Sequence, residues 1–450
     1  MSPGNIASAL KRREIVDSLR LGAVPRHGLE LFAVGLDPFE KAIDEELESV
    51  AAGKGRFKAV RGEYGTGKTF FARWLEHRAL EKGFATALVQ ISETDTPLYR
   101  METIYRRAVE ALQTKEWSDA AFRSLVDRWF FQLEEELLAT GQVDPNDDAA
   151  VERGVGELLE QRLRVVSGTQ PQFAAALRAC HAARVRGDHA IAEGLIAWLM
   201  GQPNVGAAVL RHANLKGDLD HDSAAGVLRG QLEVLKQTGR RGLVLVLDEV
   251  ETIQRVRADS REKSLNALRG LIDDLSAERY PGLYVLITGT PLFYDGPQGI
   301  KRSPPLAGRL HTDFGPDPKF DSARAPQIRL QPFDLEKLVT VGRRVRELYP
   351  SDDAARVAAT VDDGILRALA ATVAGALGGK VGIAPRIYLR RLVGLLDQVD
   401  EHPDFEPRAH ASLKIDAGEM TDEERSAAGV ARSVEDIELD LGKPARTTTE

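Results

Sequence analysis

The segment Gly62–Thr69, which reads Gly-Glu-Tyr-Gly-Thr-Gly-Lys-Thr, constrains the fold more than any other feature of the chain. It fits the pattern G-x-x-x-x-G-K-[ST], in which glycines let the backbone wrap closely around phosphate oxygens. We expect Lys68 to place its charge on the β- and γ-phosphates of ATP, and the Thr69 hydroxyl to ligate Mg²⁺. The residues expected to line the phosphates are Gly62, Glu63, Tyr64, Gly65, Thr66 and Gly67.

The segments on either side of this loop predict an α/β fold. Arg56–Arg61 has the pattern of a short strand, a helix follows from Lys68 to about Lys82, and Ala85–Ile91 is the next strand. Gly83 stands where a helix C-cap is expected. Strand, glycine-rich turn, helix and strand form a βαβ unit, so we expect the parallel sheet of a P-loop NTPase.

A second motif is an apolar strand, Leu243–Leu247, that ends in Asp248 and Glu249. A continuous apolar run is typical of a parallel strand that is buried on both faces. Ligands of α/β proteins bind at the carboxyl ends of such strands. We expect Asp248 to hold Mg²⁺ and Glu249 to orient and deprotonate the attacking water. The alternative is that one of these acids caps a helix.

A third apolar strand, Tyr284–Ile287, is followed by two hydroxyl residues, Thr288 and Thr290. Either hydroxyl could position the water between the carboxylates and the γ-phosphate, and a turn capped by threonine is the alternative interpretation. Arg309, in a long loop, and Arg386, at a helix start, are candidates to contact the γ-phosphate, because arginine carries a permanent charge and forked donors. Ordinary surface arginines would have the same sequence signature.

The spacing of the motifs predicts the domain organisation. Lys68 and Asp248 are 248 − 68 = 180 residues apart, whereas a βαβ unit needs only about 30. We therefore expect a helical insertion within the ATPase core, either as structural padding or as an interaction surface. The insertion contains the aromatic run Trp129-Phe130-Phe131. We expect these side chains to pack in the core of the insertion, which is favoured over a role in stacking on nucleic-acid bases. The expected parts are an N-terminal arm at 1–37, the core at 38–330 with the insertion at about 103–230, a helical lid at 331–405, and a disordered acidic tail at 406–450.

Composition excludes several classes of protein. The net charge is −8, which argues against a purely electrostatic DNA binder. The one cysteine, Cys180, rules out an intramolecular disulfide and a cysteine-based zinc site. No run of about 20 apolar residues occurs, so we expect no membrane span. A cytoplasmic location is the expectation that follows.

Taken together, these motifs resemble the core of an AAA+ ATPase. In that family's terms, Gly62–Thr69 resembles Walker A and Asp248-Glu249 resembles Walker B. The resemblance implies that Thr290 or Thr288 is sensor 1 and that Arg386, at the start of a helix in the lid, is sensor 2. It also suggests Arg309 as an arginine finger, although the loop that holds Arg309 lacks an Arg-Arg pair.

A closer resemblance is to the BREX-system ATP-binding proteins of the BrxD type. It is carried by Arg13–Asp17, Gly22–Pro25, Gly28–Leu31, Val34-Gly35, Gly62–Phe70 and Ile196–Gly201. The resemblance implies a role in bacterial anti-phage defence beside a helicase, with a methyltransferase as a further candidate partner. The resemblance also implies DNA contact. The basic segments of the chain are modest, and ordinary helical surface charge explains them about as well. These segments are Lys11-Arg12-Arg13, Arg343-Arg344 with Arg346, and Arg390-Arg391.

The resulting hypothesis is a DNA-associated AAA+-like ATPase, which could assemble as a homo-oligomer. One alternative is a nucleotide-dependent switch or scaffold that binds ATP with negligible turnover and recruits a defence effector. Another is a loader or regulator of a second AAA+ protein. A small-molecule kinase is disfavoured, because no feature of the sequence supplies an acceptor pocket.

Overall fold

A computed structural model of the chain describes residues 8–376 and 385–410. These residues form two compact units. The larger unit contains residues 24–63 and 67–331, and the smaller unit contains the described parts of 1–23, 64–66 and 332–450. The predicted tail at 406–450, with its apolar patch Ile437–Leu441, lies outside the described residues apart from its first few positions.

The larger unit is built on a five-stranded parallel sheet with the strand order β2-β3-β4-β1-β5. The strands are β1 (Arg56–Arg61), β2 (Ala85–Gln90), β3 (Leu243–Asp248), β4 (Leu283–Gly289) and β5 (Gln327–Arg329). Every residue of β3 and β4 is buried, as expected for apolar strands covered on both faces. The register places Gln90 of β2 beside Asp248 of β3, so the carboxyl ends of these strands meet at one edge.

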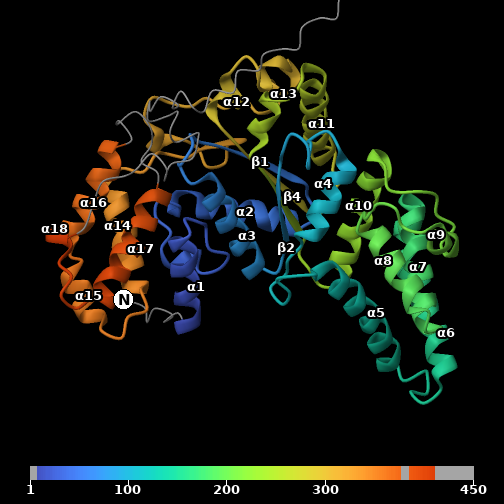
Figure 1. Cartoon of the computed structure of the whole chain (residues 1–450). Helices are drawn as coiled ribbons and strands as arrows, with labels where there is room; N and C mark the ends of the chain where they lie inside the picture. Colours follow the sequence, from blue (N-terminus) through green and yellow to red (C-terminus); the bar gives the residue numbers. More distant parts are fainter. Residues whose placement is uncertain (1–7, 377–384, 411–450) are drawn as a thin grey trace, which may run out of the picture. The chain divides into compact units, whose positions relative to one another are not determined.

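Helices cover both faces of this sheet (Figure 1). The elements around the sheet are α2 (Asp37–Ala51), α3 (Lys68–Glu81), α11 (Ala258–Ser276), α12 (Pro291–Asp295), α13 (Pro304–Arg309), and the 3-10 helices Leu29–Leu31, Val250–Gln254, Ile300–Arg302 and Pro318–Phe320. Side chains that alternate along the strands, such as Leu245 of β3 and Val285 of β4, join the main hydrophobic core on the face of α11. The alternate residues face α2 and α3.

Seven helices lie between β2 and β3 in the chain. They are α4 (Met101–Glu110), α5 (Ala121–Ala139), α6 (Asp148–Thr169), α7 (Pro171–Val185), α8 (His189–Leu199), α9 (Ala207–His212) and α10 (His221–Gln237). Trp129 and Phe130 of α5 are buried, which confirms their predicted role in the core, whereas Phe131 is about half exposed at 49%. Figure 1 shows the α5–α6 hairpin reaching away from the sheet.

The smaller unit is helical. Its helices are α1 (Ala9–Arg20), α14 (Leu335–Leu348), α15 (Ala354–Thr360), α16 (Asp363–Ala376), α17 (Pro385–Glu401) and α18 (Pro407–His410). Arg20 of α1 donates two hydrogen bonds to the carboxylate of Asp397 on α17, at 2.8 and 2.9 Å. The Tyr349 hydroxyl donates to the same carboxylate at 2.8 Å. The N-terminal helix is therefore an integral part of this helical unit.

Three segments are defined more closely by the structure than by the sequence. Residues 201–225 contain α9 and the start of α10. The long loop at 296–325 contains α13, and β5 directly after it was not predicted. Within the predicted helical lid, residues 354–376 form two helices, α15 and α16. The chain leaves the first helix at Val361, and Asp362 then caps α16 by accepting a hydrogen bond from the amide of Ile365.

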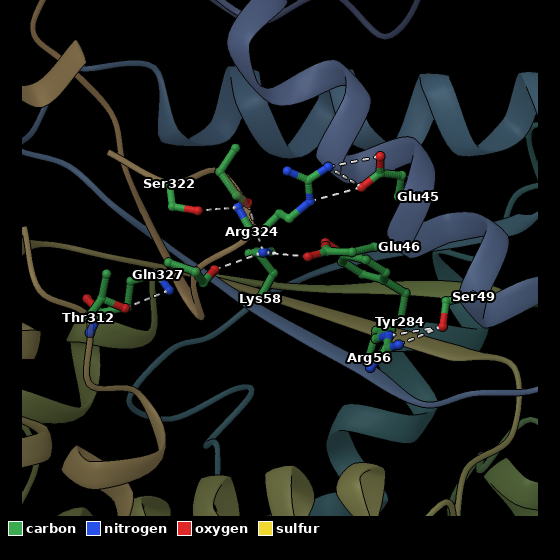
Figure 2. A network of polar contacts seen from close by, with 12 residues as sticks. Glu45, Glu46, Ser49, Arg56, Lys58, Tyr284, Thr312, Ser322, Arg324 and Gln327 are labelled. Atoms are coloured by element: carbon green, nitrogen blue, oxygen red, sulfur yellow. Dashed lines mark hydrogen bonds and ion pairs between the residues drawn. The ribbon is translucent and has the colours of Figure 1, made fainter. Parts of the chain in front are cut away.

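A buried lysine ties the strand before the glycine-rich loop to its surroundings (Figure 2). Lys58 of β1 is 1% exposed and forms an ion pair of 2.5 Å with Glu46 of α2. Its ammonium also donates to the carbonyl oxygens of Ala323 at 3.1 Å and Ala325 at 2.8 Å. The Tyr284 hydroxyl of β4 donates to Glu46 at 2.7 Å. Two strands, one helix and the segment before β5 are therefore fixed to one another around β1.

Candidate functional site

The loop 62–69 connects β1 to α3 and has the backbone that its glycines predict. Gly65 and Gly67 have φ angles of +79° and +91°, a region that residues with a side chain rarely adopt. Gly67 is also the N-cap of α3, a helix of 14 residues. Backbone amide groups at the start of a helix, together with the positive end of the helix, form a suitable site for anions such as phosphate.

Lys68, at the first position of α3, points back along the loop. Its Nζ atom donates to the carbonyl oxygens of Gly62 at 3.0 Å and Glu63 at 3.3 Å. Nζ also lies 3.8 Å from a carboxyl oxygen of Glu251, and both side chains are buried. Burial raises the pKa of Glu251 to about 7, and the charge of Lys68 opposes that rise. Glu251 was not among the residues singled out from the sequence.

A chain of polar contacts connects the three motifs. The Thr69 hydroxyl donates to Asp248 Oδ2 at 3.0 Å. The Thr288 hydroxyl donates to Asp248 Oδ1 and accepts a hydrogen bond of 3.0 Å from the backbone amide of Glu249. The strand order explains these contacts, because β4, which carries Thr288, lies between β3 and β1. Asp248 is only 3% exposed, so both of its carboxyl oxygens rely on these hydroxyls.

Glu249 has an unusual backbone conformation, with φ at +60°. A left-handed conformation at a residue other than glycine is sparsely populated and is found mainly where the surroundings enforce it. The Thr252 hydroxyl donates to the carbonyl oxygen of Glu249 at 3.0 Å, and Gln90 Nε2 donates to its carboxylate at 3.0 Å. Gln90 was also missed from the sequence, although a polar residue at the end of an apolar strand is the pattern that identified Thr288.

The remaining predicted residues, Thr290, Arg309 and Arg386, are not members of this chain of contacts. Thr290 is the N-cap residue of α12, and its side chain makes no capping hydrogen bond. Arg309 of α13 forms an ion pair with Asp273 of α11 and donates to the carbonyl oxygen of Pro305 at 2.8 Å. Arg386 is the second residue of α17 in the smaller unit. The roles suggested for Thr290, Arg309 and Arg386 therefore stay predictions.

The hydroxyl of Thr69 and the carboxylate of Asp248 fit Mg²⁺ chemically, because both offer oxygen ligands. Across residues 8–376 and 385–410, no group of three or more His, Cys, Asp or Glu side chains could hold a metal ion. Mg²⁺ usually has one or two protein ligands and completes its shell with phosphate oxygens and water. These two residues suit that role.

Some of the basic residues considered for DNA contact are engaged within the smaller unit. Arg343 donates to Asp363 at 2.8 Å, and Arg346 donates to the carbonyl oxygen of Val361 at 2.8 Å. Arg346 also lies 3.3 Å from Asp363. These contacts favour the interpretation of this segment as helical surface charge.

The larger unit has a parallel sheet and carries the phosphate-binding sequence between β1 and α3. This arrangement fits a P-loop NTPase-like fold. A family model for the BREX system ATP-binding proteins BrxC/D matches residues 7–415, and the chain belongs to this family. Membership makes it an ATP-binding component of BREX phage defence, with other BREX proteins as its expected partners. No curated protein matches the chain. None of the helices in the described parts of the chain is both long and apolar enough to cross a membrane.

Proposed function

We propose that this chain binds ATP with Mg²⁺ at residues 62–69 and hydrolyses it to ADP and phosphate. The observation that carries the proposal is the contact chain in which Thr288 bridges Asp248 and the amide of Glu249, while Thr69 donates to Asp248. It brings the candidate metal ligands and the candidate base to one edge of the sheet. Membership of an ATP-binding family supports the same nucleotide.

Each residue would have a distinct role in the reaction. Lys68 would leave the carbonyl oxygens of its own loop and contact the β- and γ-phosphates. Mg²⁺, held by Thr69 and Asp248, would neutralise phosphate charge when it is bound. Glu249 would accept a proton from water as the water oxygen bonds to the γ-phosphorus and the bond to ADP breaks. Gln90 donates to one oxygen of the Glu249 carboxylate, so it would orient the group while the other oxygen accepts the proton from water.

The rest of the chain would convert turnover into movement, as in AAA+ proteins. In this proposal α14–α17 form a lid that closes over ATP through Arg386, and the helices α4–α10 form an inserted interaction surface. Arg309 would act in trans in a homo-oligomer, after leaving Asp273. The protein would act in the cytoplasm on DNA, beside a helicase of the BREX system.

Two substitutions test the catalytic part of this proposal. Lys68→Met should weaken ATP binding at least about ten-fold, because one charge–phosphate contact contributes about 1.4 kcal/mol or more. Glu249→Gln should keep ATP binding and lower the turnover number by about 100-fold or more, as expected for loss of a general base. Nucleotide titration and phosphate release measure the two effects. Turnover at the wild-type rate in Glu249→Gln would overturn the assignment of the base.

A second measurement tests the proposed action on DNA. Steady-state ATP hydrolysis is compared without DNA, with duplex DNA and with single-stranded DNA, in the wild type and in Glu249→Gln. Stimulation by either form of DNA that is absent in the variant supports a DNA-acting ATPase. Tight ATP binding without turnover under any condition would instead support the switch or scaffold.

A further inference from the structure

The carboxyl group of Glu251 has no assigned function, although it lies inside the candidate site. It follows Asp248 and Glu249 on the 3-10 helix Val250–Gln254 and is 5% exposed. Within the described parts of the chain, neither of its carboxyl oxygens has a hydrogen-bond partner. A buried carboxyl group without hydrogen bonds is costly to the fold, so such a group needs an explanation.

The surroundings of this carboxyl group point to the lysine of the loop. The nearest cation is Lys68, whose Nζ is 3.8 Å away, beyond hydrogen-bonding distance but within range of a strong charge interaction. Burial raises the pKa of the Tyr294 hydroxyl of α12, and the charge of Glu251 adds to that rise, so the two groups interact. That hydroxyl donates to the carbonyl oxygen of Val60 at 3.3 Å.

We propose that Glu251 is a positioning residue that holds the Lys68 ammonium against the loop in the nucleotide-free protein and thereby competes with the phosphates of ATP for it. This inference rests on the proposed nucleotide site. Two hydrogen bonds to carbonyl oxygens and one carboxylate hold the ammonium in the retracted position. ATP must replace these partners with its β- and γ-phosphates.

The proposal predicts the sign of an effect on affinity. An ionised carboxylate close to the lysine attracts the ammonium and also repels the incoming phosphates, so both interactions weaken ATP binding. Glu251→Gln removes the charge and keeps the shape of the side chain. We expect it to lower the dissociation constant for MgATP by about ten-fold at pH 8. A residue with only a structural role would weaken binding when it is replaced.

Glu76 supplies a matched control. It is a second buried carboxyl group of the same unit, 4% exposed, and burial raises its pKa to about 7 as well. Its nearest cation is Arg73, at 3.0 Å. Glu76→Gln therefore removes a comparable buried charge whose ion-pair partner is Arg73 and not the loop lysine, and it should leave the dissociation constant for MgATP within about two-fold of the wild type.

The experiment is a titration of the full chain and its variants with MgATP, MgADP and AMP. Affinity should rise in Glu251→Gln for MgATP, rise less for MgADP, and stay unchanged for AMP, because the lysine contacts only the β- and γ-phosphates. If Glu251→Gln binds MgATP as the wild type does, or more weakly, the proposal is wrong. Absence of MgATP binding by the wild type would overturn the nucleotide site itself, which is a different result.

A measurement without nucleotide keeps the proposal testable even if one variant folds poorly. Urea unfolding at pH 8 of the wild type, Lys68→Met, Glu251→Gln and the double variant forms a double-mutant cycle. Lys68→Met should lower the unfolding midpoint more when Glu251 is present than in the Glu251→Gln background, because the buried carboxylate then loses its cation. Additive midpoint shifts would show that the two groups do not interact and would overturn the proposal.

Discussion

At the scale of single residues, the geometry separates the two threonines that the sequence left equivalent. Thr288 contacts Asp248 and the amide of Glu249, whereas Thr290 makes no capping contact at the start of α12. Thr288→Val keeps the shape of the side chain but removes the hydroxyl that orients both acids. We expect it to lower the turnover number by about 10–100-fold, the usual effect of losing a contact that orients a metal ligand.

The control for this prediction is Thr290→Val, since Thr290 is equally buried and lies two residues further along the chain. It should stay within about three-fold of the wild type. Phosphate release at saturating ATP measures both variants. A large loss in Thr290→Val together with normal turnover in Thr288→Val would identify Thr290 as the residue that positions water.

Local sequence patterns identify some residues of the candidate site and miss others. Lys68, Thr69, Asp248 and Glu249 could be named from the sequence because loop spacing and strand-ending acids are local patterns. Gln90 and Glu251 act through contacts with residues about 160 and 180 positions away in the chain. No local pattern encodes such contacts. The sequence offered two weaker signals for these residues: a third acid close to Asp248 and Glu249, and the polar residue at the end of β2.

At the scale of elements, the strands were predicted where apolar patterning is strong and missed where it is weak. The limits of β1 were predicted without error, and those of β3 and β4 to within two residues at each end. β5 has only three residues, two of them polar, and adds to the sheet through its pairing with β1. A short polar strand at a sheet edge depends on tertiary contacts, which single-sequence patterning does not contain.

The Lys58 network makes a testable claim about how β1 is fixed. Lys58→Met removes a cation that is 1% exposed and leaves Glu46 without its ion pair. Breaking a buried pair typically costs about 3–5 kcal/mol. Because Glu46 is 19% exposed and keeps its hydrogen bond from Tyr284, we expect a loss of about 2–3 kcal/mol in the free energy of unfolding.

The neighbouring pair provides the comparison. Arg324 and Glu45 are exposed at 65% and 47%, although Arg324 donates to both carboxyl oxygens (Figure 2). Arg324→Met should change the free energy of unfolding by less than about 1 kcal/mol, as is usual for exposed pairs. Urea unfolding monitored by circular dichroism measures both variants. Equal losses in the two variants would contradict a special role for the buried lysine.

At the scale of the whole molecule, two buried carboxyl groups give stability an unusual dependence on pH. Burial raises the pKa of Glu76 and of Glu251 to about 7, from an ordinary value of 4.5. Between these values the folded protein keeps protons that the unfolded chain has lost. The stabilisation that each group contributes is therefore complete below about pH 4.5 and is lost as the pH rises through 7.

This sign leads to a prediction for Glu76→Gln, which replaces the carboxyl group with a neutral amide. As the pH rises from 5.5 to 8, the wild type must ionise a buried carboxyl group and the variant must not. The free energy of unfolding of the variant minus that of the wild type should therefore increase by about 2 kcal/mol over this interval. Burial lowers the pKa of His181 from its ordinary value of 6.5, which affects the pH dependence of stability in the opposite direction. It is present in both proteins, so its contribution cancels.

The control for Glu76→Gln is a variant of a water-accessible carboxylate on the same helix, α3. Glu81 of α3 has a side chain that is 54% exposed and pairs with Lys115 at 2.8 Å. Glu81→Gln should follow the pH dependence of the wild type, because the side chain that it replaces is exposed to water and not buried. Urea-unfolding curves at pH 5.5, 6.5 and 8 distinguish the cases. If the Glu76→Gln and wild-type values stay parallel across that range, Glu76 is ionised in the folded protein throughout, and Arg73 compensates its burial in full.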